Sequence, residues 1–252
     1  MLAGVVGAGL LAGAAHATTI TQNVTFGPGP TDYNAATGTS GNTTFSLFDT
    51  TLGTLDSVTI GSSYGFTSTI TVTNNSASNA TGSVYTQSAS QFGSNSSAVT
   101  SVLNSVVNNA ADPIDGNSVT FGNSTLTPIA YDVRGTRTNY ALTPGFSVSG
   151  TSSGTASRTV SDTTASDLAA FSASGGGTFV PLFTTLSGLI VSNSGGNVTA
   201  VQTTTATGTL SISYNYTAPT PTPPSPPSVP EPATLALLGA SLFGLGTIRR
   251  RV

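Results

Sequence analysis

The sequence predicts an all-β protein, a β-sandwich of jelly-roll or immunoglobulin-like type with at most one short helix. An N-terminal signal peptide and a C-terminal single membrane helix are expected to flank it. In the central part, apolar residues alternate with polar ones in short runs separated by Gly, Asn, Ser and Asp, a pattern typical of strands. Charged residues make up 6% of the chain, against about 25% in ordinary soluble domains. Thr and Ser supply the polarity instead, which suits an extracellular β-protein.

The chain divides by composition into four segments. Residues 1–17 are predicted to be the signal peptide and residues 18–217 the extracellular β-sandwich. Residues 218–228 form a Pro-rich linker, and residues 229–252 form a sorting and anchoring tail.

The N-terminal segment is apolar or Gly over residues 2–15. Ala15 and Ala17 supply the small residues at positions −3 and −1 of a signal-peptidase site, so cleavage is expected after Ala17. Met1 runs directly into the apolar stretch without a basic region. A buried N-terminal helix is the alternative, but so many glycines make a poor soluble helix.

The strand candidates occupy most of the central segment. In the last of them Leu210, Ile212 and Tyr214 share one face and Thr209 and Ser211 the other, which predicts a half-buried strand. The final two candidates are expected to form an antiparallel hairpin that turns near Ala206 and Gly208. The candidates are residues 20–26, 55–60, 67–73, 82–86, 118–121, 188–192, 198–204 and 207–216.

One segment departs from the strand pattern. Residues 98–111 place Val99, Val102 and Val106 at helical spacing, and Asp112-Pro113 makes a plausible stop. Residues 145–177 are rich in Ser, Thr and Gly, and they form either a long loop or solvent-facing strands. No repeat of fixed period is present, which argues against a solenoid.

The C-terminal part has three successive features. The Pro-rich run requires extended polyproline II and cannot join a sheet. Residues 233–248 are apolar or small throughout, and as a helix they would span about 24 Å, slightly short of a bilayer core. Arg249, Arg250 and Arg251 follow, and the positive-inside tendency places them in the cytoplasm with the body outside.

This order of features closely resembles the PEP-CTERM sorting signal. The matching residues are Val229, Pro230, Glu231, Pro232 and Ala233, followed at once by the apolar segment and the arginines. The resemblance implies recognition of the Pro-Glu-Pro residues by an exosortase, a membrane-embedded cysteine transpeptidase of Gram-negative bacteria. It also implies transient anchoring in the inner membrane, with the arginines as a stop-transfer signal. An ordinary tail anchor behind a Pro-rich stalk is the alternative.

The body is similar to the choice-of-anchor domain family, type E. Matching stretches are residues 20–28, 48–55, 71–76 and 208–216. The resemblance implies a β-rich extracellular domain joined to interchangeable anchors, and it carries no biochemical activity.

Catalytic side chains are scarce in the predicted body. The chain has no Cys, and its single His, His16, lies in the predicted signal peptide. A Ser-His-Asp triad and a zinc site are therefore excluded for the mature body. Carboxylate pairs remain as possible glycosidase groups, although nothing marks any of them as an active site. The three pairs closest in sequence are Asp112 with Asp115, Asp162 with Asp167, and Asp49 with Asp56.

The side-chain composition also indicates whether the body could bind calcium or nucleic acid. Asp112, Asp115 and Asn117 have the ligand types that Ca²⁺ prefers, but they lack the spacing of an EF-hand loop, and an Asp-Gly turn leading into the strand at Ser118 is the favoured interpretation. No other cofactor is expected. Nucleic acid is not expected as a partner, because basic residues are few in the body. The Thr- and Ser-rich faces are either O-glycosylated or simply solvated.

Together these features predict an exported, non-enzymatic protein of the cell surface or biofilm matrix, with a structural or adhesive role. Its expected partners are an exosortase, transiently the inner membrane, and exopolysaccharide or other matrix proteins. The alternative is a carbohydrate- or calcium-binding extracellular module on the same anchor.

Overall fold

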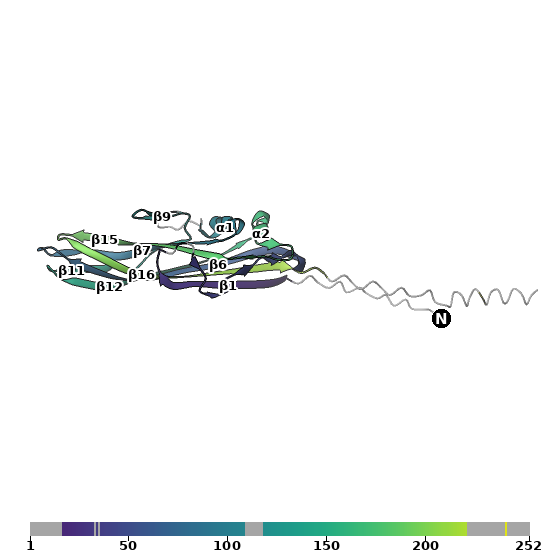
Figure 1. The fold of residues 1–252 in the computed structure, drawn as a ribbon, viewed down its shortest axis with the longest axis horizontal. Helices are drawn as coiled ribbons and strands as arrows, with labels where there is room; N and C mark the ends of the chain where they lie inside the picture. Colours follow the sequence, from purple (N-terminus) through teal and green to yellow (C-terminus); the bar gives the residue numbers. More distant parts are fainter. Residues whose placement is uncertain (1–16, 33, 35, 109–117, 221–239, 241–252) are drawn as a thin grey trace, which may run out of the picture. The chain divides into compact units, whose positions relative to one another are not determined.

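The computed structural model describes residues 17–32, 34, 36–108, 118–220 and 240, and these are mostly strands (Figure 1). Its contacts divide the chain into two units. One comprises Met1–Ala14 with Thr220–Val252, and the other is Ala15–Pro219. Nearly all described residues belong to the second unit, which we call the body.

Two large sheets form most of the body. Sheet A contains five strands in the order β12-β6-β16-β1-β3: β12 (Ser147–Asp162), β6 (Thr54–Asn74), β16 (Val198–Thr217), β1 (Ala17–Pro30) and β3 (Ser40–Gly41). Sheet B has the order β10-β7-β15-β2, and β11 also pairs with β7: β10 (Tyr131–Arg134), β7 (Ala80–Ser94), β15 (Pro181–Ser194), β2 (Ala36–Thr37) and β11 (Thr138–Leu142).

Six shorter strands form three small two-stranded sheets. These pairs are β5 (Phe48–Asp49) with β13 (Ser172–Ala173), β4 (Phe45–Ser46) with β14 (Thr178–Phe179), and β8 (Val119–Phe121) with β9 (Ser124–Leu126). The β8–β9 hairpin and the two α-helices lie on the sheet B side of the body (Figure 1). Val119 and Leu126 of the hairpin pack on Ala89 of β7, so this side of sheet B is partly covered.

Three consecutive strand pairs cross from one sheet to the other at one end of the body: β6 to β7, β11 to β12, and β15 to β16. Because β12-β6-β16 in sheet A and β11-β7-β15 in sheet B follow the same order, the three crossings lie side by side. β6 alone has 21 residues, which corresponds to a strand of roughly 70 Å.

Asn74 joins two of these crossings. Its side chain is buried, and its Nδ2 donates to the carbonyls of Ser78 at 2.8 Å and Leu142 at 3.1 Å. Its Oδ1 accepts from the Ser76 amide and hydroxyl. The amide is thus a buried polar group whose hydrogen bonds hold neighbouring turns together.

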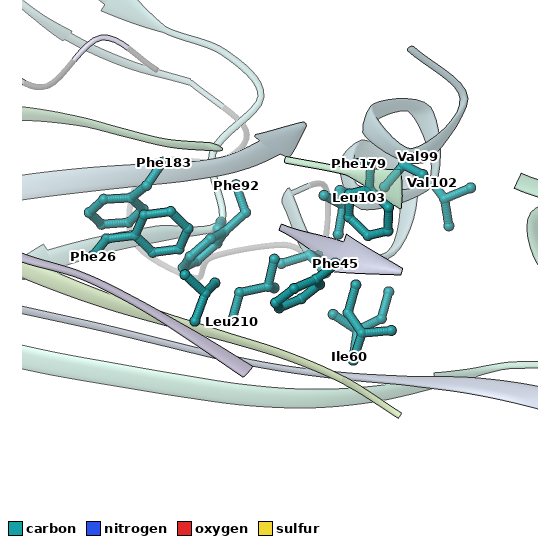
Figure 2. Packing of buried hydrophobic residues seen from close by; sticks show 14 of the residues in the cluster. Phe26, Phe45, Ile60, Phe92, Val99, Val102, Leu103, Phe179, Phe183 and Leu210 are labelled. Atoms are coloured by element: carbon teal, nitrogen blue, oxygen red, sulfur yellow. The ribbon is translucent and has the colours of Figure 1, made fainter. Parts of the chain in front are cut away.

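The main core lies between the two sheets and is aromatic. Phe26 of β1, Phe92 of β7 and Phe183 of β15 have 0% exposure, and both Phe26 and Phe92 place their ring centroids 5.1 Å from Phe183 (Figure 2). Full burial of each ring contributes on the order of 1.5–3 kcal/mol. Because these strands come from both sheets, this cluster fixes the sheets face to face.

The predicted helix is present as α1 (Ser97–Leu103), which continues as a π-helical turn, η2 (Asn104–Asn108). Ser96 caps its N-terminus, and Val99 and Leu103 enter the core. The buried Asn108 amide bonds both the N–H and the carbonyl of Phe92, which fixes the helix to β7. Residues 109–111 and the expected Asp112-Pro113 stop lie outside the described residues.

The expected all-β character is confirmed, but the predicted hairpin at residues 198–216 is wrong. β16 is one strand, paired along its whole length with β6. Gly208 lies there because a Cβ would approach ring atoms of Phe183 to 2.7 Å, not because the chain turns. In the same way, residues 55–60 and 67–73 belong to the single strand β6.

Residues 145–177 contain a solvent-facing strand, β12, followed by a second short helix, α2 (Ala165–Ala170), which was not predicted from the sequence. A 3-10 turn, η1 (Thr50–Leu52), follows β5. α2 has six residues, too few for an apolar period to be recognised in the sequence.

Candidate functional site: the hydroxyl face of sheet A

The outward side of sheet A is covered almost entirely by Thr and Ser side chains, and we call it the hydroxyl face. Odd-numbered residues of β1, β6, β12 and β16 point outward, whereas the even-numbered residues of β6 are buried without exception from Val58 to Asn74. The outward positions are the odd-numbered residues of Thr19–Thr25, Ser57–Thr73, Ser147–Ser161 and Thr199–Asn215. All of them are Thr or Ser except Asn23, Gly61, Gly65, Val201 and Asn215.

Strand pairing aligns these residues in rows across the sheet. One row places Thr69 between Thr151 and Thr203, and the next places Thr67 between Ser153 and Thr205. β12 pairs with β6 over 16 residues without a register shift. The rows therefore continue without interruption along the sheet.

Hydroxyl groups bond to each other between the strands. Thr71 and Ser149 lie 2.8 Å apart between their hydroxyl oxygens, Thr73 and Ser147 2.7 Å, and Ser63 and Thr209 2.6 Å. Such cross-strand pairs stabilise a sheet by about 0.2–1 kcal/mol each. They also hold the side chains in defined positions.

The hydroxyl face carries no charged side chain at the outward positions named above. Its single large apolar side chain is Val201, which is 59% exposed. It therefore offers neither the charges that bind ions nor an apolar centre.

The sequence pattern predicted this composition for one strand only. Thr209 and Ser211 do lie on the outward face of β16, and Leu210, Ile212 and Tyr214 are buried on the other, as predicted. The sequence did not predict that outward Thr and Ser residues align over four strands. This alignment depends on the pairing register of strands that are far apart in the chain, such as β1 and β16. Alternating Thr in 67–73 and 203–209 was the available signal.

The structure brings one of the three suggested carboxylate pairs together. The carboxyl groups of Asp162 and Asp167 are close enough to shift each other's pKa, and the buried Asp162 Oδ2 has no hydrogen-bond partner among the described residues. Burial acts to raise the pKa of Asp162, but the hydrogen bond from the Thr164 amide and the interaction with the neighbouring Asp167 carboxyl hold it below the ordinary value. The pKa of Asp167 is raised, chiefly by its interaction with the neighbouring Asp162 carboxyl.

No observed contact brings Asp49 and Asp56 together. Asp49 Oδ1 accepts from the Thr51 and Gly175 amides, each at 2.9 Å, and the Thr51 bond is the main reason that the pKa of Asp49 is lowered. Asp56 Oδ2 accepts from the Thr217 hydroxyl at 2.7 Å. Asp112 and Asp115, with Asn117, lie outside the described residues, so the suggested calcium turn stays a prediction.

A groove of about 450 Å³ lies between the β8–β9 hairpin and β15. Asp32, at its edge, has a positive φ of 68° and accepts a hydrogen bond from the Ser187 amide at 3.0 Å. Positive φ is uncommon outside Gly, although Asp and Asn tolerate it. Polar side chains predominate in the lining, which includes Asp32, Asn34, Gln91, Thr184 and Leu186.

The described part of the chain contains no group of three or more His, Cys, Asp or Glu residues placed to hold a metal ion. None of the helices in that part has both the length and the apolar character needed to cross a membrane. Apart from Ala17 and Ala240, the predicted signal peptide, with Ala15, and the predicted tail helix lie outside these residues. Ala17 begins β1, opposite Thr217 at the end of β16.

Solved structures similar to this chain show only a faint likeness. The infectious bursal disease virus Gx strain structure is 13% identical with a TM-score of 0.11, and the VP2 subviral particle of that virus is 11% identical with a TM-score of 0.09. They cover 97% and 96% of this chain, whereas the chain spans about half of theirs, 53% in both cases. Such TM-scores support no argument about fold or function. No curated protein matches the chain.

The C-terminal residues match a known family model. Residues 228–251 fit the PEP-CTERM protein-sorting motif, which includes Pro230, Glu231, Pro232 and the arginines from Arg249 onward. This motif implies export and exosortase-dependent, membrane-anchored sorting towards the cell surface. The chain therefore carries a PEP-CTERM protein-sorting motif behind a body built of β-strands.

Proposed function

We propose that this protein is a non-enzymatic structural or adhesive component of the cell surface or the extracellular matrix. The sorting motif directs the chain, and the body forms the part that remains outside. The division into residues 1–17, 18–217, 218–228 and 229–252 belongs to this proposal, as does the similarity of the body to choice-of-anchor domains.

The hydroxyl face is the observation that best supports a structural role. It runs along strands of 14 to 21 residues and has no ionisable side chain at its outward positions, so its charge does not change with pH. The chain has no Lys and no Cys, and a structural surface needs neither. In contrast, the Asp162–Asp167 pair is engaged with neighbouring backbone and hydroxyl groups at the end of β12.

The sorting part is tested by changing the motif in the native host. We expect Glu231→Ala, and separately deletion of residues 233–252, to change the location of the protein, measured by fractionation and immunoblotting. Asp56→Asn in the body serves as the control and is expected to be sorted normally. Processing and location unchanged by both tail alterations would refute exosortase-dependent sorting.

The structural part is tested by deleting the gene and measuring cohesion of the cell layer or matrix under flow. Complementation with the wild-type chain is expected to restore cohesion, and a chain lacking residues 233–252 is not. Equal cohesion in the deletion strain and the wild type would reject the structural or adhesive role while leaving the sorting unaffected.

A second candidate function is carbohydrate binding, favoured by the polar groove beside Asp32. Its amide, carboxylate and hydroxyl groups suit the hydroxyls of a neutral sugar. Calorimetric titration of the full-length chain with soluble exopolysaccharide fragments tests this, with Asp32→Asn as the variant. Asn tolerates the same positive φ, so this change removes the charge without forcing the backbone. Saturable micromolar binding that Asp32→Asn weakens would favour this candidate.

A further inference from the structure

The hydroxyl face is a two-dimensional lattice. Neighbouring strands lie about 4.8 Å apart, and outward residues repeat about every 6.7 Å along a strand. On β6, Thr67, Thr69, Thr71 and Thr73 occupy four successive outward positions, and on β16 Thr203, Thr205, Thr207 and Thr209 do the same. In register, Thr69 is opposite Thr203 and Thr67 opposite Thr205.

The lattice is also rigid. Thr is β-branched, and its χ1 angle is restricted. Several hydroxyls are fixed further by bonds to the neighbouring strand, among them Thr59 with Ser161 at 3.2 Å and Thr21 with Ser213 at 2.8 Å. Binding of a partner to this face therefore orders few side chains, so the side-chain part of the entropic cost of binding is small.

Several classes of partner do not fit this face. Spread over three to four strands, it covers roughly 800–1,000 Å², which is enough for a protein interface by area. However, the Trp, Tyr and Arg anchors that stabilise such interfaces are missing from its outward positions. Nucleic acid needs clustered positive charge, and a membrane surface needs a broad apolar or basic face.

A sugar polymer fits less well than its hydroxyls suggest. The apolar faces of sugar rings pack on aromatic or extended apolar side chains, and Val201 is the single large apolar group among these positions. What remains is a partner that is neutral, is recognised through many equal hydroxyl contacts, and repeats in two dimensions.

We propose that the hydroxyl face binds the surface of ice. Neither the hydroxyl face nor the surface of ice carries a net charge, so no ion has to be desolvated when they meet. Each Thr hydroxyl both donates and accepts a hydrogen bond, as a lattice water does. The methyl groups between the hydroxyls fill the gaps in the water layer. Single contacts are weak, and the binding depends on many of them being made at once.

The run of outward threonines on β6 and β16 is the place to disturb the lattice. Thr203 lies beside Thr69, which in turn lies beside Thr151, and both Thr69 and Thr203 are exposed. A Lys at either position would rise above the surface and hold a charged, hydrated group there. It would separate several rows from a flat partner, while leaving the buried side of the strand unchanged.

The test uses the full-length chain in detergent micelles, with empty micelles as the blank. Two quantities are measured: the fraction of labelled protein taken into slowly growing ice, and the gap between the melting and growth temperatures of a single crystal. We expect the wild type to enter ice and open a gap. Thr203→Lys and, independently, Thr69→Lys are expected to lose both. Thr120→Lys, at an exposed position of the β8–β9 hairpin, is the matched control and is expected to retain both.

Exclusion of the wild-type chain from ice, with no temperature gap, would overturn the proposal. Lys variants as active as the wild type, with unchanged circular dichroism, would do the same, as would binding to microcrystalline cellulose without uptake into ice. Two separate lattice positions guard against one variant that fails to fold. The inference goes beyond the proposed function, since sorting and matrix cohesion are measured without ice.

Discussion

Gly208 provides a sharp test of how the two sheets are packed. It lies in the middle of β16, opposite the buried Phe183 of sheet B, and its φ is not in the left-handed region. In Gly208→Ala the new Cβ would lie 2.7 Å from Phe183 Cε2 and Cζ. Phe183 cannot yield easily, because Phe26 and Phe92 both pack within 5.1 Å of its ring centroid.

Overpacking of this kind costs about 1–3 kcal/mol, against a gain of about 0.4–1 kcal/mol from the stiffer unfolded chain. For a body of this size, a cost of 1 kcal/mol corresponds to a fall in Tm of roughly 2–4 °C. The matched control is Gly93→Ala in β7, where the new Cβ would meet its nearest atom, Thr100 Cγ2, at 3.9 Å. We expect Gly93→Ala to be neutral or stabilising and Gly208→Ala to lower Tm.

Thermal unfolding of the full-length chain, followed by circular dichroism, measures both variants. Phe183→Leu should relieve part of the clash, so the double variant with Gly208→Ala should be less unstable than the sum of the single changes. A Gly208→Ala variant as stable as the wild type would refute the close approach.

Three further perturbations test other parts of the body. Asn74→Ala should lower the free energy of unfolding by about 1–3 kcal/mol, because the buried carbonyl of Leu142 loses a hydrogen-bond donor. The control is Asn75→Ala, which removes a bond to the Thr199 hydroxyl on the exposed side and should change the free energy of unfolding by under about 0.5 kcal/mol. Equal effects of the two variants in denaturant titrations would contradict this role for Asn74. Asn108→Ala removes the hydrogen bonds to the N–H and carbonyl of Phe92, so it should increase amide hydrogen exchange in α1 more than Asn104→Ala does. An exchange rate unchanged by Asn108→Ala would show that packing alone holds the helix. Asp167→Asn should reduce the pH dependence of stability. The lowered pKa of Asp162 stabilises the fold at pH values above the ordinary Asp pKa, and this stabilisation is lost as the pH falls through the folded-state pKa. The raised pKa of Asp167 stabilises the fold at pH values below the ordinary Asp pKa, and this stabilisation is lost as the pH rises through the folded-state pKa. The wild-type pair therefore contributes most near the ordinary Asp pKa of about 4 and less at neutral pH. Because Asp167→Asn removes the second carboxylate that lies beside Asp162 when both groups are ionised, the variant should gain Tm relative to the wild type at neutral pH. Asp56→Asn is the control, and parallel curves of Tm against pH for wild type and Asp167→Asn would reject the coupling between the two carboxyl groups.

The residues that could be recognised in advance are those whose meaning is local. Alternation in residues 207–216 correctly predicts a strand with Leu210 and Ile212 buried, since the side-chain period of a strand is two. Helical spacing of Val99 and Val102 likewise predicts α1. Pro230, Glu231 and Pro232 are identifiable because the motif is contiguous, and its match at residues 228–251 needs no folding.

Composition and local order thus establish that the body is β-rich and weakly charged, and that the chain carries a sorting motif at its C-terminal end. Tertiary structure decides what Gly208 does, which turns Asn74 joins, and how the threonines of β6 and β16 align. These features depend on pairing between residues far apart in the chain, such as Thr69 with Thr203. Since a shift of one residue in register turns every side chain to the other face, the hydroxyl face exists only once the core aromatics have set the strand positions.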